Sequence, residues 1–158
     1  MPIYMNIDGI PGDVTAAGHE KWIEVNSFQW GTGRAISSPV GGSADREASA
    51  PSVSEIVVTK ASDNASTKLL AEALWGEGKL VKIDFCKTDK DKFEVYYNYE
   101  LENTLISGYS LSSGGDRPTE SISLNFTKVT FNATPTGAKH DTGSPDRVMY
   151  DLALGKGG

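Results

Sequence analysis

The run Phe93-Glu-Val-Tyr-Tyr-Asn-Tyr-Glu-Leu-Glu102 decides the fold, because mainly apolar positions alternate along it with mainly polar ones. Successive side chains leave a β-strand on opposite faces, so this alternation predicts a strand with one face toward a core and the other toward water. Leu80–Lys87 alternates in the same way, and the polar segment Thr88–Lys92 lies between the two runs. Together they predict a β-hairpin.

Similar alternation predicts further strands along the chain. The other strand candidates are Ile3–Ile7, Trp22–Trp30, Val53–Lys60, Thr104–Ser112 and Val148–Leu154. Ile122–Phe126 also alternates, but Val129–Phe131 continues with the opposite parity, so we predict a β-bulge near Thr127 and Lys128. About eight strands in all predict a mainly β protein that folds as a compact β-barrel.

One segment has helical periodicity instead. Apolar residues recur three and four positions apart within Ala65–Trp75, Asp63 or Asn64 can cap its start, and Gly76 can end it. We therefore expect one short helix, Ala65–Trp75, beside the barrel.

Two segments rich in small and polar residues, Arg34–Ser52 and Ala133–Asp146, fit neither pattern. Loops longer than about 12–15 residues are uncommon in compact domains and are usually functional or disordered. The first segment carries charges among small residues, so it can order against a charged partner as well as remain a surface loop. We expect a single domain over residues 1–158, with a flexible tail at 155–158.

Composition excludes several classes of protein. The net charge of −6 and the lack of a Lys/Arg cluster argue against a nucleic-acid partner. Cys86 is the only cysteine, so the chain forms no internal disulfide. We find no signal-peptide pattern and no apolar run of about 18 residues, so we expect no membrane span and folding in a reducing cytosol.

The chain has few residues that could bind a metal ion or act as a nucleophile. His19 and His140 have no partner at metal-ligand spacing and are expected to be exposed, so we predict no metal site. Asp89–Glu94 resembles a calcium loop but lacks its glycine and distal glutamate, which favours a solvated turn. By strand parity Cys86 lies on a polar face without a base to activate it, and we interpret it as an incidental thiol.

No nucleophile motif or phosphate-binding motif is present. The chain has no Gly-x-Ser-x-Gly elbow, and neither Gly31-Thr-Gly33 nor Gly114-Gly115 is followed by Gly-Lys-Ser/Thr. We therefore expect no enzyme activity and no cofactor. A β-barrel hydrolase and a monomeric β-barrel ligand-binding module remain as alternatives to a protein that binds copies of itself.

Three stretches resemble the Hcp family, the haemolysin-coregulated proteins of bacterial type VI secretion systems. They are Ile23-Glu-Val-Asn-Ser-Phe-Gln-Trp-Gly31, Glu55-Ile-Val-Val-Thr-Lys-Ala-Ser62, and the long block from Tyr99-Glu-Leu-Glu-Asn-Thr-Leu-Ile-Ser-Gly-Tyr109 through Ser113-Gly-Gly-Asp-Arg-Pro-Thr-Glu-Ser121 to Leu124-Asn-Phe-Thr-Lys128. The likeness extends from Ile3 to Leu154.

The resemblance implies a β-barrel with one flanking helix, of which six copies form a ring. Rings stack into a tube inside a contractile sheath, beneath a spike, and some effectors travel in the lumen. The tube is secreted to the medium or a target cell without a signal peptide. The chain ends soon after its last strand, so we expect no appended toxin domain.

The family's long loop after the second strand reaches toward the neighbouring ring, and here Arg34–Ser52 fills that position. The resemblance therefore implies that Arg34, Asp45, Arg46 and Glu47 contribute to ring-to-ring contacts. Gln29 alternates with Phe28 and Trp30. If those two rings pack inward, Gln29 faces the lumen and can touch cargo.

Overall fold

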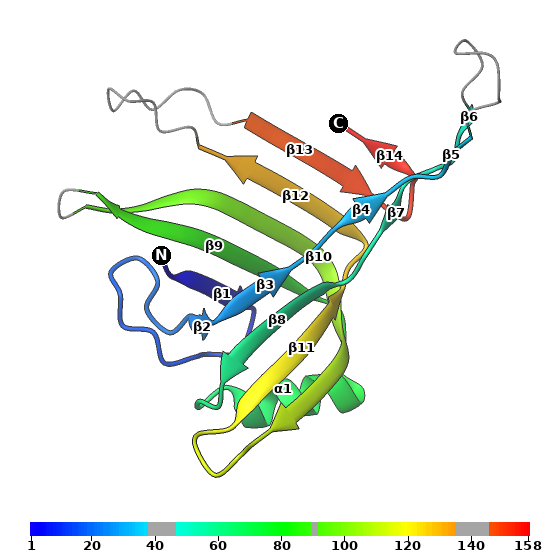
Figure 1. Cartoon of the computed structure of the whole chain (residues 1–158). Coiled ribbons are helices and arrows are strands. Elements are labelled where there is room, and N and C mark those ends of the chain that lie inside the picture. Colours follow the sequence, from blue (N-terminus) through cyan, green and yellow to red (C-terminus); the bar gives the residue numbers. More distant parts are fainter. Residues whose placement is uncertain (38–46, 90–91, 135–145) are drawn as a thin grey trace.

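The computed structural model describes residues 1–37, 47–89, 92–134 and 146–158, and strands dominate it (Figure 1). Within these ranges there is one helix, α1 (Ser66–Trp75). The strands are β1 (Ile3–Ile7), β2 (Ile23–Val25), β3 (Ser27–Gln29), β4 (Thr32–Gly33), β5 (Ile36–Ser37), β6 (Glu47–Ala48), β7 (Ser52–Val53), β8 (Ile56–Ala61), β9 (Lys79–Asp89), β10 (Lys92–Ser112), β11 (Thr119–Asn125), β12 (Lys128–Ala133), β13 (Asp146–Asp151) and β14 (Lys156–Gly157). The prediction of a mainly β fold with one helix is confirmed.

β10 is the strand that holds the sheet together. Its first half pairs antiparallel with β9 on one side and β12 on the other, as the predicted hairpin requires, and its second half, Leu105–Ser112, pairs with β11. Between the halves Asn103 has a φ of 51°, a left-handed conformation that asparagine tolerates better than most residues. The two strands expected at Phe93–Glu102 and Thr104–Ser112 are therefore one bent strand.

The strands curl around a common core but do not close into one continuous ladder. One run of neighbours is β12, β10, β9, β1 and β2, and the other is β10, β11, β8 and β3. Asn26 separates β2 from β3, and its backbone N–H donates a hydrogen bond of 2.7 Å to the Thr59 carbonyl. β1 pairs with one side of this break and β8 with the other. The expected barrel is thus an open sheet that wraps around its core.

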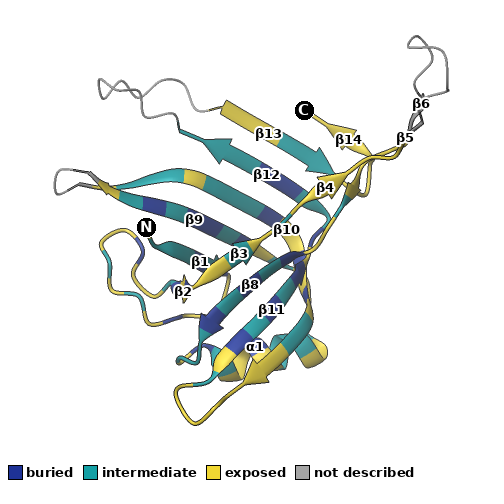
Figure 2. Cartoon of the chain, in the orientation of Figure 1, coloured by how far each residue is buried: buried dark blue, intermediate teal, exposed yellow. Residues whose placement is uncertain are grey.

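The core lies inside this wrapped sheet, where the inward positions of facing strands meet (Figure 2). Ile56 and Val58 of β8 are fully buried, as are Ile122 and Leu124 of β11. β1, β2, β9, β10 and α1 contribute further buried residues, which include Met5, Ile23, Val81, Ile83, Leu101 and Leu69. Period-two burial along β8 and β11 is what the alternating sequence predicts.

The bulge predicted near Thr127 and Lys128 is wrong. β11 ends at Asn125 and β12 begins at Lys128, so the change of parity is a passage between two strands. β11 pairs with the second half of β10 and with β8, whereas β12 pairs with the first half of β10 and with β13. The chain therefore leaves one part of the sheet and enters another, and each part uses its own parity.

The C-terminal residues form a short last strand. Lys156 and Gly157 form β14, which pairs with β13, and Gly158 and Met149 exchange two backbone hydrogen bonds of 2.8 and 2.9 Å. These bonds place the C-terminal residues at an edge of the sheet, and the flexibility expected for 155–158 stays a prediction.

Helix α1 starts one residue later than predicted and ends before Gly76, as predicted. Asp63 organises its start, because its carboxylate accepts a 2.9 Å hydrogen bond from the backbone N–H of Ala65. Leu69 is buried, whereas Leu70, Leu74 and Trp75 are exposed. The helix therefore docks through a narrow contact and leaves much of its apolar surface uncovered.

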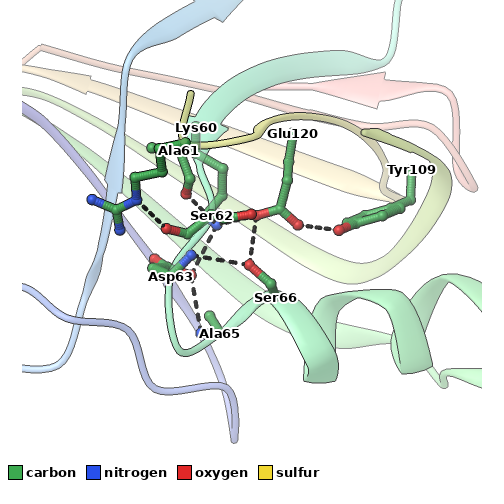
Figure 3. A network of polar contacts seen from close by, with 9 residues as sticks. Lys60, Ala61, Ser62, Asp63, Ala65, Ser66, Tyr109 and Glu120 are labelled. Atoms are coloured by element: carbon green, nitrogen blue, oxygen red, sulfur yellow. Dashed lines mark hydrogen bonds and ion pairs between the residues drawn. The ribbon is translucent and has the colours of Figure 1, made fainter. Parts of the chain in front are cut away.

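A buried ion pair fixes this helix to the sheet (Figure 3). Lys60 of β8 and Glu120 of β11 are cross-strand partners at inward positions, both side chains are fully buried, and Nζ lies 2.6 Å from Oε1. Lys60 also donates to Asp63 at 2.9 Å, and Glu120 accepts from Ser66 of α1 at 2.7 Å and from the Tyr109 hydroxyl. Each buried charge is thereby satisfied by several partners, as burial of charge requires.

The network shifts two pKa values. Burial by itself raises the pKa of the Glu120 carboxyl, but hydrogen bonds from Lys60, Ser66 and Tyr109 outweigh it, and the pKa is lowered from 4.5. Burial, together with the hydrogen bond to Glu120, raises the pKa of Tyr109 to about 12. Glu120 is therefore ionised and Tyr109 protonated at neutral pH.

Removing one charge should be costly. We expect Lys60→Met to lower the free energy of unfolding by about 3–5 kcal/mol, because it leaves the Glu120 carboxylate buried without its main partner. Lys60→Met with Glu120→Leu should recover part of that loss. Urea unfolding followed by tryptophan fluorescence measures both. Lys128→Met is the matched control, because it breaks the partly exposed Lys128–Glu102 pair and should cost less than about 1 kcal/mol. Equal losses for the two single variants would contradict the assignment.

The same network should make stability depend on pH. Because the folded pKa of Glu120 lies below 4.5, its contribution is fully present above that value and is lost as the pH falls through the lowered pKa. Glu120→Gln removes the titrating carboxyl. As the pH falls below 5, the free energy of unfolding of this variant should therefore decrease less than that of the wild type. Urea unfolding over this pH range provides the comparison, and parallel pH profiles would refute the prediction.

Candidate functional site

The segment expected as a loop at Arg34–Ser52 begins and ends as a two-stranded ribbon that projects from the sheet (Figure 1). β4 pairs with β7 at its base, and β5 pairs with β6 farther out. We call residues 31–37 together with 47–54 the arm.

Serine side chains form hydrogen bonds between the two sides of the arm. The Ser54 hydroxyl accepts a 3.0 Å hydrogen bond from the Gly31 backbone N–H, and Ser52 donates to the Gly33 carbonyl at 3.2 Å. Farther out, Ser49 Oγ accepts from the Ala35 N–H at 3.1 Å. These bonds supplement the few backbone bonds of each short ladder.

The arm buries little of itself. Residues 31–36 and 49–52 are exposed, and Ile36 exposes 53% of its surface. An isolated two-stranded ribbon is only marginally stable in water, because it lacks an apolar face to cover. An arm of this kind is suited to pair with or lie on another surface.

The four predicted ring-contact residues are only partly described. Arg34 is exposed on the arm, and the backbone of Glu47 pairs with Ser37 in the β5–β6 ladder. Asp45 and Arg46 lie outside the described residues. The structure therefore brings Arg34 and Glu47 to the same projecting arm, and their contacts with a partner stay a prediction.

Gln29 lies on β3 beside the base of the arm. It is exposed, whereas Phe28 is half-buried against Phe85 and Tyr99, with ring centroids 5.0 Å away in each case. Gln29 also lines an open groove of about 640 Å³ that includes Glu55 and arm residues 31–33 and 52–54. The inward packing of Phe28 agrees with the parity argument, and a lumenal role for Gln29 stays a prediction.

Two sequence interpretations of reactive residues were wrong about exposure. His19 is buried, and its Nε2 lies 2.8 Å from Asp84 Oδ2, while Asn98 donates to the other oxygen at 2.5 Å. Cys86 is fully buried, and burial followed by the nearby Asp84 charge raises the pKa of its thiol to about 11. A thiol of this pKa is a poor nucleophile at neutral pH.

Neither residue forms part of a metal site in the described ranges, where no cluster of three His, Cys, Asp or Glu side chains could hold an ion. His140 and residues 90–91 of the calcium-like run Asp89–Glu94 lie outside those ranges. No helix of the described chain is long and apolar enough to cross a membrane.

Comparison with known proteins decides the family. The model of a family described as "Type VI secretion system effector, Hcp" matches residues 4–132. The chain belongs to the Hcp family. A solved "type six secretion system protein" is 29% identical, with a TM-score of 0.90 over 99% of both chains. No curated protein matches the sequence.

More distant solved structures share the fold. Hcp1 from Salmonella typhimurium is 21% identical, with a TM-score of 0.78 over 99% of this chain and 97% of that one. A type VI secretion system effector from Yersinia pestis is 23% identical, with a TM-score of 0.71 over 94% and 98% of the two chains. The open wrapped sheet described above is therefore an Hcp fold.

Sequence reasoning missed some parts of this Hcp chain. Lys60 pairs with Glu120 across 60 residues, and His19 pairs with Asp84 across 65. No local sequence pattern predicts pairs this far apart. The arm left a local signal, because Ser52 and Ser54 are two residues apart and lie on one face of a strand. That spacing in a small-residue segment could have indicated a ribbon.

Proposed function

We propose that this Hcp protein is the subunit of the inner tube of a type VI secretion system, that six copies form a ring, and that rings stack into the tube. The observation that carries the proposal is the family match over residues 4–132, together with likeness over 99% of both chains to a solved secretion-system protein. Membership in the type VI secretion system is established by that match, and the assembly is our inference.

The architecture supports a protein that works by self-association. A projecting arm with few contacts to its own sheet needs an outside surface, and an identical subunit supplies one at high local concentration. One heterologous contact that closes after six copies gives a ring. A second, which does not close, stacks rings into a filament with a direction.

Within this proposal the segment Arg34–Ser52 makes the ring-to-ring contact, through Arg34, Asp45, Arg46 and Glu47. Gln29, exposed beside the base of the arm, faces the lumen and touches cargo. The other partners are the sheath proteins, the spike protein and secreted effectors. The tube acts as a mechanical conduit without catalysis or a cofactor, and it leaves the bacterial cytoplasm when the sheath contracts.

Imaging the purified protein at high concentration tests the proposal. We expect six-fold rings in electron micrographs and a matching hexamer by native mass spectrometry, because rings form by mass action. The concentration must be raised stepwise for the same reason. A protein that stays monomeric at the highest soluble concentration would instead favour a ligand-binding module.

Charge reversal within the Arg34–Ser52 segment tests ring stacking separately. Arg46→Glu should reduce the yield of tubes severalfold and leave rings intact, because it replaces an attraction between rings by a repulsion. Tube length and ring number in micrographs give the two readouts. Arg147→Glu is a charge-matched control at an exposed position of β13. Unchanged tube yield with Arg46→Glu would count against Arg34–Ser52 as the stacking contact.

A further inference from the structure

An apolar groove lies between the base of the arm and the β12–β13 part of the sheet. It has a volume of about 480 Å³. Its lining comprises Trp30, Gly31, Thr32, Pro51, Val53, Val129, Phe131, Val148 and Tyr150. None of these described lining residues is charged, and three are aromatic. This is the composition of an interface centre, where charged residues are depleted and aromatic ones enriched.

The groove is an uncovered continuation of the core. Phe131 is paired with Val148, and Val129 with Tyr150, so the four side chains share one face of β12 and β13. Phe131 stacks on Tyr99, with ring centroids 4.8 Å apart, but Val148 still exposes 63% of its surface. The apolar face of β12 and β13 is therefore only partly covered by other residues of the chain.

A second apolar surface lies on α1. Leu70 and Leu74 are four positions apart and therefore lie on one side of the helix, next to Trp75. Leu70 exposes 44% of its surface, Leu74 64% and Trp75 75%. We call these three residues the α1 stripe. It is a convex helical ridge, the shape that an apolar groove receives in helix-in-groove recognition.

The groove and the stripe lie at opposite ends of the molecule. Figure 1 shows α1 at the end away from β13, β14 and the base of the arm. One chain cannot bring its own stripe into its own groove without unfolding the sheet between them. Two copies can do so, and each copy would keep one groove and one stripe free for the next.

We propose that the groove is an interface between copies of this chain and receives the α1 stripe of a second copy. The proposal rests on the self-association proposed above and assigns surfaces to it. Thr32 and Val53 belong both to the groove lining and to the strands at the base of the arm, so this contact is continuous with the one proposed for Arg34–Ser52. The contact is heterologous, as rings and stacks require.

The test uses lysine substitutions on each surface. Val148→Lys and Leu74→Lys should each raise the concentration at which half the protein is assembled by at least about tenfold, because each would bury an unpaired charge. Analytical ultracentrifugation over a concentration series measures this. Val148→Ile keeps the β-branched apolar side chain and should assemble like the wild type. Thermal unfolding of dilute protein checks that both lysine variants remain folded, as expected at exposed positions.

Crosslinking tests the pairing directly. The double variant Val148→Cys, Leu74→Cys should form disulfide-linked oligomers under mild oxidation, whereas each single variant should form far fewer, because Cys86 is buried. Denaturing gels without reductant give the readout. Oligomers only in the double variant support the proposal.

Each failure has its own meaning. If the wild type assembles and Val148→Lys assembles equally well, the groove is not an interface, but the proposed function still holds. A Val148→Lys defect without one in Leu74→Lys, or without crosslinks, overturns the pairing with α1. A wild type that never assembles overturns the proposed function itself, and with it the interface.

Discussion

The pairing of β10 with three other strands is the constraint on which the architecture depends. β9 and β12 flank its first half and β11 its second, so every strand of the large sheet connects to β10 directly or through these partners. The left-handed backbone of Asn103 lets the strand turn between the two halves. The bend wraps the sheet around the core, and part of the apolar face of β12 and β13, including Val148, stays exposed. The core and the proposed interface thus have a common origin.

Most strands could be predicted from the sequence, and the errors share a cause. Alternation reports which residues share a face, but not which strand lies opposite. The sequence predicts one bulged strand from Ile122–Phe126 to Val129–Phe131, because a passage between two parts of the sheet changes parity just as a bulge does. Strand parity predicts a solvent-exposed face for Cys86, yet that face of β9 is covered, because Cys86 and Asp84 are both buried and Asp84 bonds to His19. The arm was recognisable as unusual, but its ribbon depends on serine contacts across 14 to 23 residues.

Two buried polar networks attach the parts of the chain that strand pairing does not hold. Lys60 and Glu120 connect α1 to β8 and β11, and the His19–Asp84 pair connects the segment between β1 and β2 to β9. Asn98 extends the second network to Asn132 of β12, at 3.2 Å. Buried hydrogen-bonded charges fix orientation because few arrangements satisfy them. The position of α1, and hence of its exposed stripe, is therefore set by the first network together with the buried Leu69.

The serine bonds of the arm have a consequence for how the protein can change over evolutionary time. Ser49, Ser52 and Ser54 bond to backbone groups, which every residue except proline offers in full. The path of the arm therefore places little demand on the identity of the residues across from them. Side chains that point away from the arm are free to diverge while its trajectory is kept. Compatibility between subunits of different lineages can then be lost or gained without any change in the sheet that carries the arm.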